Sequence, residues 1–199
     1  MAKLALNKSS LNREGKRLQT FRQFLPALDL KRKQLLSARL DTRRRLQANE
    51  VALQALHQQV ERQLLMLADT DVPVEGLIRI RELEIGKRNL VGVELPQLQQ
   101  LELEYTSYSR LMLPHWVDPL LEMQEQAVRL EVDIKLDLLS LQRLEQAIQK
   151  TTQRLNLFDK VLIPKTESNI RRIRIALSDA ERAGVVRAKL AKSKHRSLA

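Results

Sequence analysis

Cysteine is absent from the 199-residue sequence, so disulfides, thiolate zinc sites and thiol nucleophiles are excluded. Aromatic residues make up only 3% and glycine occurs five times, which is little for a broad globular core. No segment approaches the roughly 18 uninterrupted apolar residues of a membrane span. The first residues also lack the apolar core of a signal peptide. We therefore expect a cytoplasmic protein that reaches a membrane only through partners, without inserting into the bilayer itself.

Charged residues are abundant, at 30%, and they are unevenly placed around a net charge of +11. Residues 1–50 hold 13 Lys and Arg against 4 Asp and Glu, and residues 151–199 hold 12 against 4. The residues between them hold 10 against 16, so two basic ends flank an acidic middle. A basic excess of this size suggests binding to nucleic acid or to an anionic membrane. The alternative is an arginine-rich helix surface that is merely solvated.

Apolar residues recur at every seventh position over the first third of the chain. Eight of ten positions at this spacing are Leu or Val, in the series Leu4, Leu11, Leu18, Leu25, Arg32, Arg39, Leu46, Leu53, Val60 and Leu67. A second apolar position follows three or four residues later, at Phe21, Leu28, Leu35 and Leu56. A repeat held over so many heptads is the coiled-coil signature, because it keeps one apolar seam facing a partner helix. It predicts a coiled-coil helix over residues 1–67.

The second half of the chain carries the same repeat. Its first seam series is Leu113, Leu120, Ala127, Ile134, Leu141, Ile148, Leu155 and Leu162. Its second is Trp116, Met123, Leu130, Leu144 and Phe158. After Pro164 the pattern resumes in a shifted register, which indicates a local unwinding of the supercoil, at Ile170, Ile173, Leu177 and Ala180. The repeat predicts a second coiled-coil helix over residues 117–190, followed by a disordered basic tail over residues 191–199.

Residues 68–116, between the two repeats, have a different character. They hold three of the five glycines and three of the six prolines, and apolar residues alternate with polar ones over residues 78–95. This period of two predicts a β-hairpin near 78–95, with its turn near 86–89 and a bulge at Arg81 and Glu82, where the alternation changes phase. Residues 97–112 leave room for a short helix.

The predicted fold class is therefore mainly α: a long antiparallel two-helix coiled-coil hairpin with a small insert that contains a β-hairpin. Asp137 falls on the seam, where we expect it to fix the register opposite Asn49. Pro26 and Pro164 lie inside the helical runs at nearly matching heights. Since a proline removes one backbone hydrogen bond and clashes with the preceding turn, we expect both helices to kink or break there.

Little in the sequence indicates catalysis. His57, His115 and His195 are isolated from other metal-ligating side chains, and Gly86-Lys87-Arg88 lacks the remaining residues of a phosphate-binding loop. We predict no catalytic, cofactor-binding or metal-binding residues and no enzyme activity. A nucleic-acid-binding protein stays open because the arginine clusters at 43–45 and 171–174 could follow phosphates, although no aromatic platform for base stacking accompanies them. A basic coiled-coil scaffold is the other alternative.

Two segments carry a resemblance to a known family. Arg154 and Asn156, followed by Val161, Ile163 and Pro164 and then by spaced isoleucines and a basic tail, resemble the C-terminal signature of the D subunit of V/A-type (vacuolar/archaeal-type) rotary ATPases. Near the start, residues 28–35 are similar to a Leu- and Lys-containing element of the same family. The resemblance covers essentially the whole chain. It departs from the family at Pro26, where many relatives have a helix-compatible residue or glycine.

The resemblance implies a mechanical role as the central rotor shaft in ATP synthesis or ATP-driven ion (proton or sodium) transport. The D subunit transmits torque between the catalytic head, made of the A and B subunits, and the membrane rotor ring. Its paired terminal helices enter the head, while the insert end joins the small F subunit of the central stalk. A membrane-side coupling subunit seats the shaft on the ring. ATP is bound by the head, so the resemblance implies a non-catalytic subunit without a cofactor, and no binding to nucleic acid. It also implies a cytoplasmic location, peripheral to the membrane.

Overall fold

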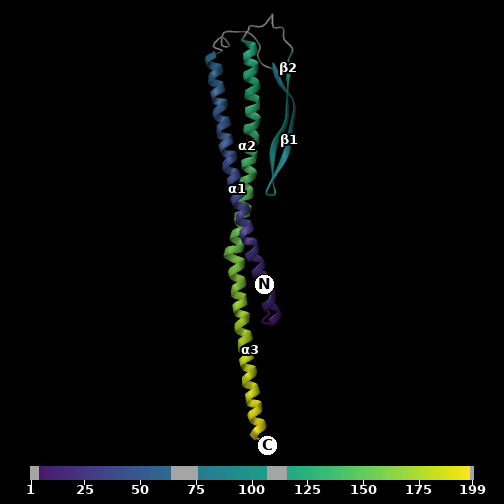
Figure 1. The fold of residues 1–199 in the computed structure, drawn as a ribbon, viewed down its shortest axis with the longest axis vertical. Coiled ribbons are helices and arrows are strands. Elements are labelled where there is room, and N and C mark those ends of the chain that lie inside the picture. Colours follow the sequence, from purple (N-terminus) through teal and green to yellow (C-terminus); the bar gives the residue numbers. More distant parts are fainter. Residues whose placement is uncertain (1–4, 64–75, 107–115, 198–199) are drawn as a thin grey trace. The chain divides into compact units, whose positions relative to one another are not determined.

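The computed structural model describes residues 5–63, 76–106 and 116–197. Its elements follow in the order α1 (Lys8–Gln63), β1 (Ile78–Leu90), β2 (Val93–Tyr105), α2 (Val117–Leu157), the π-helical turn η2 (Phe158–Leu162) and α3 (Ile163–Ser197) (Figure 1). The chain divides into two compact units. The terminal unit comprises Met1–Arg32 and Lys150–Ala199, and the middle unit comprises Lys33–Gln149. These elements confirm a mainly α fold with long N- and C-terminal helices and an antiparallel β-hairpin.

The two heptad series form the buried seam, as predicted. Among their members, the buried apolar side chains include Leu35, Leu46, Leu56, Leu120, Met123, Leu144 and Ile173, while Arg39 is exposed. Within the middle unit, Arg45 binds Asp137 and Leu56 packs in one cluster with Leu120, so α1 and α2 run antiparallel. Within the terminal unit, Glu14 meets Asn169. α1 begins where it does because the Asn7 side chain accepts a hydrogen bond from the Ser10 N–H at 2.8 Å, which caps the helix.

The β-hairpin is longer than predicted, and its turn lies elsewhere. β1 and β2 pair from Ile78 opposite Tyr105 to Leu90 opposite Val93, so the chain reverses at residues 91–92. The turn predicted near 86–89 is wrong because Gly86 lies within β1. β2 continues to Tyr105, so residues 97–105 are strand and not part of the short helix considered for residues 97–112. Residues 107–112 lie outside the described residues. The bulge predicted at Arg81 and Glu82 is confirmed by the register shift between Ile80 and Glu82.

The turn itself is unusual in its residue type. Val91 has φ 51° and Gly92 has φ 77°, the left-handed pair typical of a two-residue type I′ turn. Such turns favour Asn-Gly, because a β-branched side chain is strained at positive φ. The turn is held by the Asn89 side chain, which accepts a hydrogen bond from the Gly92 N–H at 2.8 Å. Because valine is disfavoured in such a turn, the residue types at 91–92 do not indicate a turn in the sequence.

The shifted register near Pro164 has a direct structural cause. In η2 the N–H of Ile163 donates to the carbonyl of Phe158, five residues earlier, so this turn holds one residue more than an α-turn. The seam accordingly resumes at Ile170, one residue later than seven-residue spacing from Leu162 would give. The wider turn directly precedes Pro164, whose ring would otherwise clash with a carbonyl in the preceding turn.

The break expected at Pro26 is wrong, since α1 continues through it as an α-helix. The Arg22 carbonyl loses its helical partner because Pro26 has no backbone N–H. Both residues lie exposed, so water can satisfy this carbonyl. At the far end α3 reaches Ser197, so residues 191–197, expected as a disordered tail, are helical. The predicted end of the first helix at residue 67 lies outside the described residues.

Candidate interaction surfaces

The base of the β-hairpin is anchored in the main apolar cluster of the middle unit. Buried side chains from α1, the hairpin and the start of α2 form it: Leu56, Leu77, Trp116, Val117, Leu120, Leu121 and Met123. The Thr106 N–H donates to the Leu77 carbonyl at 2.9 Å, and the Tyr105 hydroxyl donates to Glu125 on α2 at 2.6 Å. The hairpin is therefore fixed to α2 at its base.

The Tyr105–Glu125 contact shifts the ionisation of both groups. The hydrogen bond from Tyr105, followed by one from Arg129, lowers the pKa of Glu125 below its ordinary value, and the same bond to Glu125 raises the pKa of Tyr105. Because the folded pKa of Glu125 is depressed, the contact contributes stability above the unfolded pKa. That contribution is lost as the pH falls through the folded pKa. Acid therefore loosens this anchor.

Towards its tip the hairpin covers a groove of about 750 Å³ in the middle unit. Arg143 on α2 donates to the backbone carbonyl of Glu94 at 2.8 Å, so the tip also lies along α2. The apolar residues that line the groove include Leu90, Leu95 and Leu136. Its polar lining includes Arg45, Asp41, Thr42, Asp133, Asp137 and Ser140.

Asp137 is the most constrained polar group of this groove, with a side chain only 4% exposed. Arg45 Nε donates to both carboxylate oxygens at 3.0 and 2.9 Å, and the Arg45 Nη2 donates as well. The partner predicted for Asp137, Asn49, is wrong: Arg45 lies one helical turn earlier on α1 and reaches the seam with its longer side chain. The hydrogen bond to Asp137 raises the pKa of the Arg45 guanidinium, so the arginine remains charged at all ordinary pH values.

One face of the hairpin is apolar and open. Ile80, Leu83 and Ile85 of β1 are 49%, 40% and 48% exposed. The register places them opposite Leu103, Leu101 and Leu98 of β2, so six aliphatic side chains share one face. A group of half-exposed aliphatic side chains of this kind is characteristic of an interaction surface. The sequence showed the alternation but not which face would stay open.

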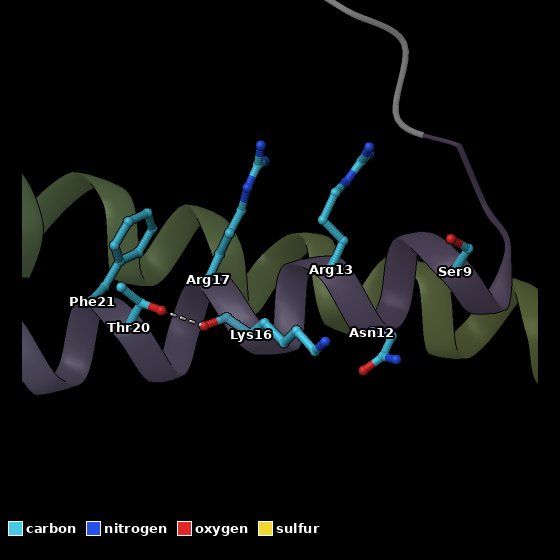
Figure 2. Close-up of a pocket in the computed structure, with 7 residues that line it drawn as sticks. All are labelled: Ser9, Asn12, Arg13, Lys16, Arg17, Thr20 and Phe21. Carbon is cyan, nitrogen blue, oxygen red and sulfur yellow. Dashed lines mark hydrogen bonds between the residues drawn. The ribbon is translucent and has the colours of Figure 1, made fainter.

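The terminal unit presents basic side chains on α1. Figure 2 shows Arg13 and Arg17 projecting from the same side of the helix, whereas the Lys16 side chain runs along the helix. They border a shallow surface depression of about 490 Å³ whose lining comes entirely from residues 9–21 of α1. Arg17 is paired with Glu14 at 2.9 Å. Because one convex helix supplies the whole lining, the depression does not enclose a small ligand.

The histidines considered as ligands are not brought together by the structure. His57 lies exposed on α1, while His115 and the side chain of His195 lie outside the described residues. Within residues 5–63, 76–106 and 116–197 no group of three metal-ligating side chains is found. Over the same residues, every helix is too short or too polar to cross a bilayer. The surfaces with distinctive geometry are therefore the hairpin face, the groove beside it and the basic helices.

Comparison with known proteins gives a consistent result. Residues 10–193 match the sequence profile of the ATP synthase D subunit. The chain belongs to the ATP synthase D-subunit family. It is 30% identical over 193 residues to the V-type ATP synthase D subunit of Borreliella burgdorferi, with 97% of this chain and 95% of the relative aligned. It is 33% identical over 198 residues to the V-type ATP synthase D subunit of Chlamydia muridarum, with 97% and 96% aligned. The corresponding Chlamydia trachomatis serovar L2 protein is 32% identical over 200 residues.

Membership of the D-subunit family confirms the resemblance seen in the sequence. The most specific part of that resemblance, from Asn156 to Pro164, coincides with η2 and its flanks. As a D-subunit homologue, the chain is a component of a V-type ATP synthase and works together with other subunits. We therefore expect its contacts with those subunits on its surfaces rather than in an internal cleft.

Proposed function

We propose that the chain is the central-stalk subunit, or rotor axle, of a V/A-type ATPase. In this role it transmits torque between the catalytic head of A and B subunits and the membrane rotor ring, and catalyses no reaction itself. The match to the D-subunit family over residues 10–193 carries the proposal. The axle is proposed to lie on the cytoplasmic side, peripheral to the membrane. There it joins the small F subunit and a membrane-side coupling subunit.

The contacts between the helices support a torque-bearing role. Torque tends to slide one helix along the other, and side chains that interlock across the seam resist this. In the terminal unit the Phe21 and Phe158 rings meet edge to face at 5.4 Å, and Arg22 binds Glu167 at 2.7 Å. In the middle unit, Arg45 and Asp137 form the equivalent cross-link. The pairs contribute modest stability one by one, but together they fix the register.

The first test uses a purified catalytic head. We expect the chain to form a stable complex with it at moderate salt, detected by size-exclusion chromatography, and to hydrolyse no ATP alone in a coupled assay. A nucleic-acid-binding protein would instead bind RNA or DNA with an affinity that falls steeply with salt. Salt-sensitive RNA binding without affinity for the head would overturn the proposal. ATP turnover by the chain alone would overturn its non-catalytic part.

We further propose that the small F subunit binds on the open apolar face of the β-hairpin. Ile80, Leu83 and Ile85 are half-exposed there. A partner that covers them removes their remaining apolar surface from water, which favours binding. Replacing the three with serine is expected to weaken binding of this partner about 10- to 100-fold, measured by calorimetry. The seam is untouched, so helix content should not change.

A matched control lies on the opposite face of the same strand. Arg79, Glu82 and Glu84 alternate with the apolar residues and are also exposed. Replacing these three with serine should leave the affinity within about threefold of the parent, since rim charges contribute little to binding. Equal losses in both variants would show that the apolar face is not the contact.

A further inference from the structure

The two strands of the β-hairpin have unequal surroundings. β2 is fixed to α2 twice, by the Arg143 guanidinium at the Glu94 carbonyl (2.8 Å) and by the Tyr105 hydroxyl at Glu125 (2.6 Å). The apolar side chains of β2 are partly buried, whereas those opposite them on β1 are exposed: Leu98, Leu101 and Leu103 against Ile85, Leu83 and Ile80. β2 is therefore the inner strand of the hairpin and β1 the outer strand.

The hydrogen-bond pattern of the hairpin is fixed at both ends. At the base the Thr106 N–H donates to the Leu77 carbonyl at 2.9 Å, and at the tip Leu90 and Val93 close the two-residue turn. In an antiparallel pair, residues that bond each other alternate with residues whose N–H and C=O groups point away from the partner strand. A bulge sets two residues opposite one, so the alternation continues through it. Counting from either end gives the same outward-pointing residues on β1, among them Ile80, Leu83, Ile85, Lys87 and Asn89.

Two observations on β2 agree with this pattern. Glu94 and Pro96 lie opposite Asn89 and Lys87, so their backbone groups also point away from the partner strand. The Glu94 carbonyl accepts its bond from Arg143, and a proline fits at position 96 because no N–H is needed there for the pairing. The outer edge of β2 is thus partly covered by α2. In the part of the chain that the structure describes, nothing is bonded to the backbone along the outer edge of β1.

The side chains of β1 suit pairing with a second copy of the same strand. Glu82 precedes Ile85 by three residues and Arg88 follows it by three, and both charged side chains are exposed. If two such strands run antiparallel with Ile85 opposite Ile85, Glu82 of each copy lies opposite Arg88 of the other. Leu83 of each copy then lies opposite Lys87, whose aliphatic stem can cover it. A parallel arrangement in register would instead place like charges side by side.

We propose that free copies of the chain pair through the outer edge of β1, as an antiparallel two-fold dimer centred on Ile85. The two hairpins then form one four-stranded sheet. Backbone hydrogen bonds between the edges supply the affinity, as in other cases of β-strand addition, and the aliphatic side chains gain neighbours across the new pair. The bulge at Arg81 ends the paired stretch, which keeps the contact short. The F subunit is proposed to cover the same apolar face, so the dimer belongs to the chain before assembly.

Sedimentation velocity of the full purified chain measures this pairing. Between about 2 and about 300 μM we expect a shift from monomer to dimer, with a Kd on the order of 10–100 μM, because only about five residues of each edge pair. Lys87→Pro removes an outward N–H from the edge and should raise the Kd about tenfold or more. Lys87→Ala is the matched control. It also removes the ion pair with Glu94 (3.0 Å) but keeps the N–H, so its Kd should stay within about threefold of the parent.

A charge exchange tests the antiparallel register. Glu82→Arg alone, or Arg88→Glu alone, places like charges opposite each other at both ends of the paired stretch and should raise the Kd about fivefold to tenfold. Combining the two substitutions restores opposite charges and should return the Kd to within about threefold of the parent. Trp116 fluorescence checks the fold of every variant, because Trp116 is buried in the cluster that anchors the hairpin.

A chain that stays monomeric over the whole concentration range would overturn the edge-paired dimer. So would a dimer that Lys87→Pro and Lys87→Ala weaken equally, or one that the combined charge exchange does not restore. If Lys87→Pro changes the Trp116 emission, the charge exchange decides alone, since it leaves the backbone unchanged. All of these measurements use the free chain, so their failure leaves the rotor assignment standing, and failure to bind the catalytic head leaves the dimer standing.

Discussion

Replacing Arg45 with methionine should lower the free energy of unfolding by about 2–3 kcal/mol, measured by urea denaturation. The reason is that Asp137, only 4% exposed, would be left as a buried carboxylate without its guanidinium. Breaking a fully buried pair in this way costs about 3–5 kcal/mol. The smaller figure applies because the Arg45 side chain is itself 61% exposed and water can reach part of the site.

Two further variants define the origin of that loss. Adding Asp137→Leu to Arg45→Met removes the orphaned charge and should restore stability to within about 1 kcal/mol of the parent. Arg44→Met is the matched control, since Arg44 is 72% exposed and lies 3.9 Å from Asp41. It should change stability by less than about 0.5 kcal/mol. If Arg45→Met changes the free energy of unfolding as little as Arg44→Met does, the Arg45–Asp137 pair does not hold the register.

Truncating Leu144 to alanine should have a still larger effect, a loss of about 2–5 kcal/mol in the free energy of unfolding. Leu144 is fully buried at the seam in the middle unit, so its removal leaves a cavity. Leu138, on the same helix, is 50% exposed and provides the comparison. Leu138→Ala should cost less than about 1 kcal/mol in the same urea titration followed by circular dichroism. Similar losses would mean that the seam does not dominate the stability of α2.

The seam was predictable because it depends on spacing alone. Leu46 and Leu144 sit in seven-residue series, and a helix must bury such a series on one side. The second buried stripe of α2 was missed. Val132, Leu136 and Ser140 follow each other at four-residue intervals beside the seam, where Leu136 and Ser140 line the groove next to the hairpin. That stripe depends on where the insert folds back, and heptad counting carries no information about it.

The partner of Asp137 and the hairpin turn could not be read from the sequence for different reasons. Asp137 was placed correctly on the seam, but long side chains reach across from off-seam positions, so Arg45 displaced Asn49 as its partner. The turn at Val91 and Gly92 contradicts local preference, because valine rarely takes a left-handed conformation. The apolar face of the hairpin followed the predicted alternation. Its exposure depends on tertiary packing.

The π-turn at Phe158–Leu162 has a consequence for how the gene tolerates changes in length. Elsewhere in α2 or α3, loss of one codon would rotate every later side chain by about 100° and take the seam away from its partner. Within η2, the same loss would only remove the additional residue and return the helix to its regular period. Only the clash at Pro164 would then remain. These five codons are therefore the place in the C-terminal helix where a one-residue length change can be absorbed.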